Sequence, residues 1–359
     1  MDGVYSRRLF LGGLAGLGAG AMLGGNRLSG QGRISLINVH HHLTAPAYVK
    51  FLMENKVRDF PNKSAAESVE DMDKAGVTTA ITSIIGPGIW FGDLSATRRL
   101  ARECNHYAAK LMADYPGRFG MFTMLPLPDV DASLREIEYG FDTLKADGVY
   151  LFTNFGGKAL YGDKYLGDPV LAPIYEELNR RKAVVYTHPK EPACCHELIP
   201  GTNPATIEYP MDTTRSIMSL LVTGTAGKYP DVKFIFSHGG GATASVAGRI
   251  VGAAATYLED GGVLRPGAPA PRSSLQMPRG PLYELQKFYY DTSGASNPIA
   301  MGALRRMVPM SQILFGTDFP FASSAEQLNL LKECGVFNAK ELQAIYRENA
   351  GKLLPHYRS

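Results

Sequence analysis

Three consecutive histidines, His40, His41 and His42, are the residues of this chain whose types and spacing most directly suggest chemistry. They follow a short apolar run, residues 34–39, that is typical of a strand. Because side chains alternate along a strand, His40 and His42 would share one face, and His41 would lie on the other. Neutral imidazole is a common zinc ligand, so the pair on one face is half of a metal site. A polar patch without a metal explains the triplet equally well at this point.

Three further polar residues also come directly after apolar runs. His188 follows residues 183–187, His238 follows residues 233–237, and Asp318 follows residues 312–317. A polar group at the buried end of a strand costs free energy unless it is paired or coordinated. Several histidines and a carboxylate at strand ends are difficult to explain as independent core residues. The metal-site interpretation is therefore favoured.

The elements that would position these residues alternate regularly along the chain. Short β-branched or aromatic runs predict eight strands, at residues 34–39, 77–84, 119–124, 148–153, 183–187, 232–237, 288–291 and 312–316. Helical patterns lie between and after them, at residues 64–74, 94–114, 132–146, 169–181, 213–228, 242–258, 298–307, 324–334 and 339–354. Eight strands, each followed by a helix, predict an α/β fold of the (β/α)8 TIM-barrel type. In such barrels catalytic groups come from the C-terminal ends of the strands.

The barrel is predicted to occupy residues 33–357 as a single domain. Ser64 followed by Glu67 has the spacing of a helix-capping box. Two stretches, 45–61 and 261–281, are too long for minimal connections. We expect them to be loop insertions at the C-terminal face of the barrel.

Residues 1–30 are predicted to be an export signal and not part of the fold. Residues 6–12 read Ser-Arg-Arg-Leu-Phe-Leu-Gly and resemble a twin-arginine signal, which carries folded, often cofactor-loaded proteins. The Gly/Ala/Leu stretch that follows is too short for a stable membrane span. Export to the bacterial periplasm is expected. The cleavage point, and retention as an anchor, are left open.

The composition excludes some function classes. The chain has 359 residues, of which 45% are hydrophobic and 20% charged, with a net charge of +3. No basic run recurs along a face, so nucleic-acid binding is not expected. The four cysteines, Cys104, Cys194, Cys195 and Cys334, do not predict a disulfide framework, and ordinary burial is expected for the adjacent pair.

The motifs around these residues, taken as a set, resemble the amidohydrolase superfamily. They are Asn38-x-His40-x-His42, Thr187-His188-Pro189, Ser237-His238-Gly239-Gly240-Gly241 and Gly316-Thr317-Asp318-Phe319-Pro320. The branch that looks nearest contains the aminocarboxymuconate semialdehyde, γ-resorcylate and 6-methylsalicylate decarboxylases. Residues 173–188 and 209–215 also resemble that branch.

The resemblance implies a site with one divalent metal ion, for which Zn²⁺ is expected and Mn²⁺ is the alternative. Its ligands would be His40, His42, His188 and Asp318, and the catalytic residues would be His238 and Asp318. Binuclear relatives carry a bridging lysine at the end of the fourth strand, whereas here no lysine follows that strand until Lys158. The chain also departs from many relatives at Asn38, where they have Asp.

The leading functional hypothesis is a non-oxidative decarboxylase of an aromatic or unsaturated carboxylic acid, resembling a hydroxybenzoate. A single-metal hydrolase acting on a lactone or a carbon–carbon bond is the alternative, and a non-catalytic barrel that binds a metal or an anion is a minor one. The resemblance also implies a homodimer or homotetramer.

Candidate substrate contacts each have a structural alternative. Arg215 would pair with a substrate carboxylate or lie on the helix surface, and Trp90 and Phe91 would pack on the substrate ring or within a lid. Asn38 is the remaining candidate. The run Gly239–Gly241 would hold an anion or simply form a tight turn.

Overall fold

The computed structural model describes residues 35–157, 162–196, 198–251 and 279–358, together with 255–256, 265–266 and 277. The predicted export signal and most of the stretch 261–281 lie outside the described residues. Among the helices of the described part, none is long and apolar enough to cross a membrane.

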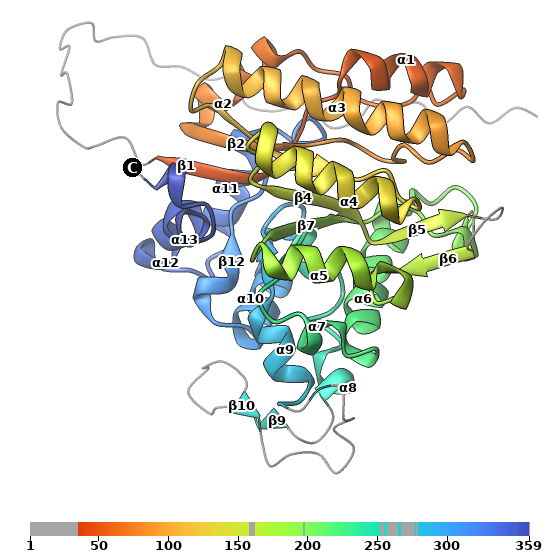
Figure 1. The fold of residues 1–359 in the computed structure, drawn as a ribbon. Helices are drawn as coiled ribbons and strands as arrows, with labels where there is room; N and C mark the ends of the chain where they lie inside the picture. The colour runs from red at the N-terminus through yellow and green to blue at the C-terminus, as the bar shows by residue number, and fades with distance from the viewer. Residues whose placement is uncertain are drawn as a thin grey trace, which may run out of the picture. The chain divides into compact units, whose positions relative to one another are not determined.

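Eight parallel strands form a closed barrel, as predicted (Figure 1). Their order in the sheet is β1-β2-β3-β4-β7-β8-β11-β12. The barrel closes between its last and first strands, where the Val39 amide donates to the Phe315 carbonyl at 3.0 Å. The strands are Leu36–His42, Val77–Ser83, Phe119–Met124, Gly148–Phe152, Val184–His188, Lys233–Phe236, Tyr289–Asp291 and Ile313–Leu314, in that order.

The interior of the barrel is filled by large side chains and not by a channel. Phe122 and Tyr186 stack with their ring centroids 5.1 Å apart, and Tyr150 also stacks on Tyr186, at 6.0 Å. Ile235 and Leu314 are also completely buried. Interdigitated layers of this kind are the usual core of a TIM barrel.

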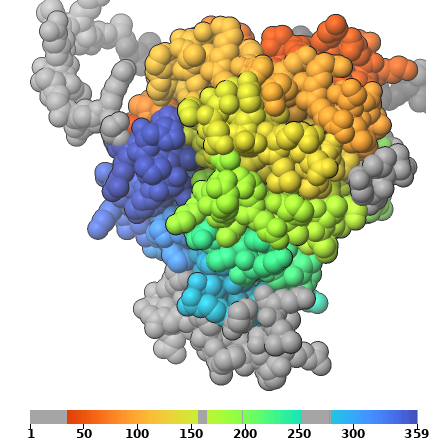
Figure 2. All heavy atoms as spheres, in the orientation of Figure 1, coloured from red at the N-terminus to blue at the C-terminus, as the bar shows by residue number. Residues whose placement is uncertain are grey.

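Helices surround the strands, and α3, α4 and α5 form a continuous layer over one face of the barrel (Figure 2). The helices before β8 are α1 Pro46–Glu54, α2 Ala65–Ala75, α3 Leu94–Asp114, α4 Val130–Glu138, α5 Ala172–Arg180, α6 Glu208–Val222 and α7 Thr225–Lys228. Those after it are α8 Ala247–Val251, α9 Pro281–Lys287, α10 Pro298–Met307, α11 Ser324–Glu333, α12 Ala339–Gln343 and α13 Asn349–Leu353. The capping box predicted for α2 is present, with the Ser64 side chain accepting from the Glu67 amide.

The prediction of a loop over residues 45–61 is wrong in its first half, because that stretch contains helix α1. Pro46 begins the helix, and Tyr48 and Leu52, one turn apart, are completely buried. Burial of this i, i+4 pair stabilises a helix that the local sequence pattern did not reveal. The antiparallel hairpin of β5 (Asn154–Gly157) and β6 (Gly162–Tyr165) was also missed, since its glycine-rich strands lack an alternating pattern.

Other boundaries moved for identifiable reasons. The helix expected over 213–228 begins earlier, at Glu208, and is divided into α6 and α7 by Gly224, whose φ is +74°. A left-handed residue ends a helix, and glycine adopts that conformation without steric cost. The helix expected over 242–258 is described only as α8, and the rest of it lies largely outside the described residues.

The C-terminal segment is attached near the start of β4 by a buried carboxylate. His356 Nε2 lies 2.6 Å from Asp147 Oδ1, and the Tyr357 hydroxyl donates to Asp147 Oδ2 at 3.1 Å. The hydrogen bond to Asp147 raises the pKa of His356. A raised pKa means that the charged histidine stabilises the folded state below its ordinary pKa of about 6.5, and that this stabilisation disappears as the pH rises through the higher folded value.

We therefore expect the His356→Gln variant to lose about 0.5–1 kcal/mol of unfolding free energy at about pH 5.5, because His356 is more than half exposed and solvent screens the pair. At about pH 9.5 the loss should be much smaller. Urea unfolding at the two pH values measures both. An equal loss at both would show that packing, and not charge, holds the segment.

Candidate metal centre

All five residues singled out at strand ends converge at the C-terminal mouth of the barrel. His40 Nε2 and His42 Nε2 are 3.1 Å apart, and His188 Nε2 and His238 Nε2 are 3.2 Å apart. Asp318 Oδ1 lies 3.1 Å from the first two nitrogens and 3.9 Å from that of His188. His40, His188, His238 and Asp318 therefore bring their ligand atoms to one place, and His42 lies beside His40 and Asp318.

Each imidazole is oriented by a contact of its other nitrogen. His40 Nδ1 donates to Asp291 Oδ2 at 3.0 Å, and His42 Nδ1 lies 3.0 Å from the Ser83 hydroxyl. The other two rings donate to backbone carbonyls, His188 to that of Pro189 at 2.7 Å and His238 to that of Ser293 at 3.2 Å. Outer contacts of this kind fix the tautomer and the ring orientation of metal ligands.

A cation fits this arrangement. A neutral imidazole that donates through Nδ1 carries a lone pair on Nε2. In His40, His188 and His238 that lone pair points at the same place as Asp318 Oδ1, which has no hydrogen-bond partner. Converging lone pairs repel one another unless a positive charge lies between them. Three imidazoles and a carboxylate are a donor set typical of Zn²⁺ and its neighbours in the first transition row.

The charges of the site are consistent with a cation. Burial lowers the pKa of His188 and of His238 to about 4, so both are neutral near pH 7. Burial alone would lower the pKa of His40, but Asp291 and Asp318 outweigh it and raise the value to about 9. Burial would raise the pKa of Asp318, yet the adjacent histidines hold it well below its usual range. The carboxylates thus attract a positive charge, which a metal ion can supply in place of a proton.

Backbone strain is concentrated at two members of the cluster. His238 has a φ of +54° and Asp318 a φ of +61°, a region that residues other than glycine rarely adopt. The His238 amide donates to Asp291 Oδ1, and the Asp318 amide donates to the His40 carbonyl, each at 3.0 Å. Strained residues that are held by such contacts are typical of functional sites.

The geometry provides two possible sets of three histidines. The ligand atoms of His40, His188, His238 and Asp318 all lie within 4.8 Å of one another. The resemblance assigned His42 as the third histidine ligand and kept His238 for catalysis. His42 also touches the centre, so its assignment stays a prediction.

Asp291, the last residue of strand β11, connects several parts of the site. It accepts from His40 through Oδ2 and from the amides of His238 and Ser293 through Oδ1, and the Tyr186 hydroxyl donates to it at 2.8 Å. Its position at the end of the seventh strand was the available signal. Gly316 leaves it room, since a Cβ at that glycine would lie 2.8–2.9 Å from Asp291 and His40 atoms.

We expect Asp291→Asn to weaken metal binding by about 10–100-fold, because an amide orients His40 without a negative charge. Titration calorimetry of the metal-stripped protein measures the affinity. Asp114→Asn, which changes an exposed carboxylate paired only with Lys110, is the matched control. Unchanged affinity in Asp291→Asn would mean that His40 does not depend on this contact.

Two residues next to the ligands have structural roles. His41 points away from the centre, as predicted; its Nε2 lies 2.6 Å from the Ser68 hydroxyl, and its ring stacks on Phe319. Asn38 was a candidate substrate contact, but its amide instead bonds to His41 and Thr317 and accepts from the His40 amide. It is completely buried, so we assign it to positioning β1 against β12.

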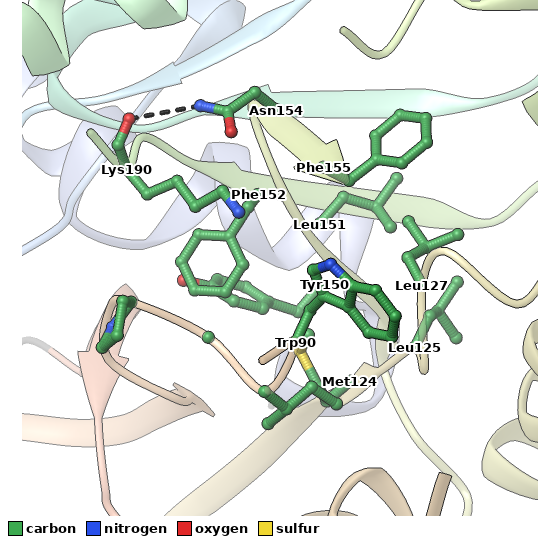
Figure 3. Close-up of a pocket in the computed structure, with 13 residues that line it drawn as sticks. Trp90, Met124, Leu125, Leu127, Tyr150, Leu151, Phe152, Asn154, Phe155 and Lys190 are labelled. Atoms are coloured by element: carbon green, nitrogen blue, oxygen red, sulfur yellow. Dashed lines mark hydrogen bonds between the residues drawn. The ribbon is translucent and has the colours of Figure 1, made fainter. Parts of the chain in front are cut away.

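Of the two aromatic candidates, Trp90 lines a small pocket and Phe91 lies outside it. The pocket wall also contains Tyr150, Phe152 and Lys190 (Figure 3). Phe152 pairs with His188 between β4 and β7, so this wall adjoins the metal centre. Phe91 is 41% exposed, and its ring packs edge-on against that of Phe51 in α1.

Two further aromatic residues near the mouth were not among the predicted site residues, although Tyr209 begins the stretch 209–215 that resembles the decarboxylase branch. Phe321 is 58% exposed, and its ring centroid lies 6.2 Å from that of His42. The Tyr209 ring lies 6.5 Å from that of His188. Phe321 comes three residues after Asp318, which was the only signal for it.

Arg215 belongs to helix α6, and its side chain contacts the segment that connects β7 to that helix. Its Nη2 donates to Cys195 Sγ at 3.9 Å, and its Nη1 is buried without a hydrogen-bond partner. The run Gly239–Gly241 forms a tight turn: its amides bond back to Ser237 and His238, and Gly241 packs against the Pro210 backbone. The turn interpretation therefore accounts for these glycines.

The sequence of this chain is similar to those of known proteins over most of its length. A family model described as amidohydrolase matches residues 37–356. The decarboxylase yanB of Aspergillus niger is 35% identical over 341 residues, which cover 89% of this chain and 88% of that protein. The 6-methylsalicylic acid decarboxylase of Penicillium expansum is 35% identical over 80% of this chain and 85% of its own length.

Solved structures agree on the fold. A crystal structure of an amidohydrolase II superposes with a TM-score of 0.77 at 25% identity, covering 89% of this chain and all of the other. A dihydroxybenzoic acid decarboxylase of Polaromonas, solved with bound manganese and 2-nitroresorcinol, has a TM-score of 0.75 at 21% identity. It covers 90% of this chain and 98% of that one.

Proposed function

This chain belongs to the amidohydrolase family, and on that basis we propose that it is a metal-dependent carboxy-lyase. It would remove carbon dioxide, without oxidation, from an aromatic or unsaturated carboxylic acid similar to a hydroxybenzoate. The observation that carries the proposal is the convergence of three imidazole nitrogens and one carboxylate oxygen, with the His42 imidazole beside them. Among the described residues, no second group of side chains is arranged to hold a metal.

The end of β4 supports a single-metal site. Thr153 and Asn154, at the position where binuclear relatives were expected to carry a lysine, instead donate to the buried Asp212. The two sequence relatives named above are decarboxylases, and neither supports the hydrolase alternative. A barrel that only binds a metal would not need the strained backbone of His238.

When bound, a divalent metal would act as a Lewis acid that holds the substrate carboxylate and a neighbouring oxygen and spreads the charge left by carbon dioxide. His40, His188 and Asp318 would hold it, together with His42. His238 is neutral near pH 7 and keeps its proton on Nδ1, so Nε2 is the atom that can accept a proton and deliver it to the ring carbon. Asp291 holds the His238 backbone in place during this transfer.

Zinc is the metal we propose, with manganese as the alternative. The three nitrogen donors favour zinc, whereas a related dihydroxybenzoic acid decarboxylase was crystallised with manganese. Metal analysis of the purified protein, followed by reconstitution of the stripped protein with each ion, distinguishes them.

The direct test is to incubate the metal-loaded protein with 6-methylsalicylate, 2,6-dihydroxybenzoate and a panel of lactones. Decarboxylation should release carbon dioxide and leave the ring intact. Ring-opened products that keep their carboxylate, formed without carbon dioxide, would show that the protein is a hydrolase and would contradict the proposal.

Two further parts of the proposal concern assembly and location. We propose a homodimer or homotetramer, which light scattering tests, and export to the periplasm by the twin-arginine route. The basis for export is the sequence of residues 6–12. Fractionation of cells that produce the full chain, compared with an Arg7→Lys/Arg8→Lys variant, tests it. Equal periplasmic amounts of the two would contradict a twin-arginine route.

A further inference from the structure

Two adjacent cysteines lie in the segment that connects β7 to α6, a few residues after His188. Cys194 is exposed and Cys195 is partly exposed, contrary to the burial expected from the sequence. The remaining cysteines, Cys104 and Cys334, are 4% and 7% exposed. The accessible thiols of the described protein are therefore gathered in one pair.

The pair is arranged as a unit. Residues 193–195 form one 3-10 turn, and the Cys194 and Cys195 side chains are within hydrogen-bonding reach of each other. Both are thiols and not a disulfide. The two sulfurs can therefore bind one atom that is large and soft enough to bridge them.

A cation lies beside this pair. Arg215 Nη2 donates to Cys195 Sγ, while Arg215 Nη1 is buried and has no hydrogen-bond partner. The hydrogen bond with Cys194 and burial raise the pKa of Cys195 to about 11, and Arg215 opposes part of that rise. The guanidinium therefore offsets part of the cost of forming the thiolate, which is the nucleophilic form. The unpartnered Nη1 provides a donor for an oxygen or anionic group on whatever binds the sulfurs. The proposed decarboxylation uses neither cysteine.

We propose that Cys194 and Cys195 form a dithiol site that binds trivalent, thiophilic arsenic compounds, with Arg215 promoting the reaction. For phenylarsine oxide, two S–H bonds and the arsenic–oxygen bond are exchanged for two As–S bonds. The two protons leave with the oxygen as one water molecule, and arsenic stays trivalent. No oxidant or reductant is needed. This site is independent of the metal centre and of the decarboxylase assignment.

The test is intact-mass analysis of the folded, metal-loaded protein after treatment with phenylarsine oxide. The expected result is one phenylarsenic group per chain, which 2,3-dimercaptopropanol removes and an excess of a monothiol does not. Cys194→Ser and Cys195→Ser should each abolish the stable adduct, while the matched control Cys334→Ala keeps it. An unmodified wild-type protein, or single variants that keep the adduct, would overturn the proposal. Metal content measured in parallel should not change, and its loss would place the reagent at the metal centre instead.

The contribution of Arg215 has its own readout. Arg215→Met should leave the stoichiometry at one and slow the modification by about three- to tenfold, because the thiolate fraction falls up to about tenfold for each unit of pKa. Thermal unfolding verifies that the variant is folded. An unchanged rate would show that Arg215 does not promote the reaction of the two thiols.

Discussion

The His40→Ala and Asp318→Ala variants are expected to lose the bound metal and the decarboxylase activity together. Both residues lie where the ligand atoms converge, and removing either leaves only three donors of the ligand set that the resemblance assigns. A bound metal supplies several kcal/mol of transition-state stabilisation, so activity should fall by about 10³-fold or more.

Metal content by mass spectrometry and carbon dioxide release measure the two losses separately. His106→Ala is a suitable control, since His106 is an exposed histidine whose ring bonds to Tyr139. Circular dichroism verifies that the barrel is folded. Full metal occupancy in either variant would contradict the ligand assignment, and lost metal with retained turnover would contradict the role of the metal in catalysis.

Replacing His238 with glutamine should abolish most turnover while leaving metal content near normal. General acid–base groups contribute about 10²–10⁴-fold to rate, and His238 is placed to move a proton at Nε2. Metal content and carbon dioxide release, measured on the same sample, separate the two effects.

The same experiment decides between the two possible ligand sets. His238 lies as close to His188 as His42 lies to His40. If His238→Gln loses the metal and His42→Ala retains it, His238 is the third histidine ligand, and His42 takes the proton-transfer role. The opposite pattern supports the assignment made from the resemblance.

The strands were predictable because burial on both sides of a parallel sheet gives continuous apolar runs. β3 has the predicted bounds, and the other strands differ by a few residues at their ends. Helix α1 and the β5–β6 hairpin were not predictable in the same way. α1 is stabilised by the burial of Tyr48 and Leu52 against other elements, and the glycine-rich hairpin strands carry no local pattern.

The site was predictable where a polar residue interrupts an apolar run, as at His188, His238 and Asp318. A site residue was not predictable where its role is to hold neighbouring side chains in place. Asp291 ends a strand like the others, but only the structure shows that it joins His40, His238 and Tyr186. Similarly, Asn38 looked like a substrate contact until its amide was found bonded within the barrel wall.

The stacked rings of Phe122, Tyr186 and Tyr150 make the centre blind-ended. These side chains are at most 3% exposed and fill the barrel below the histidines, so that route offers no exit. Substrate, proton and carbon dioxide therefore reach and leave the histidines from the side away from these rings. Substrate binding and product release consequently use the same side of the site and must follow one another in each cycle.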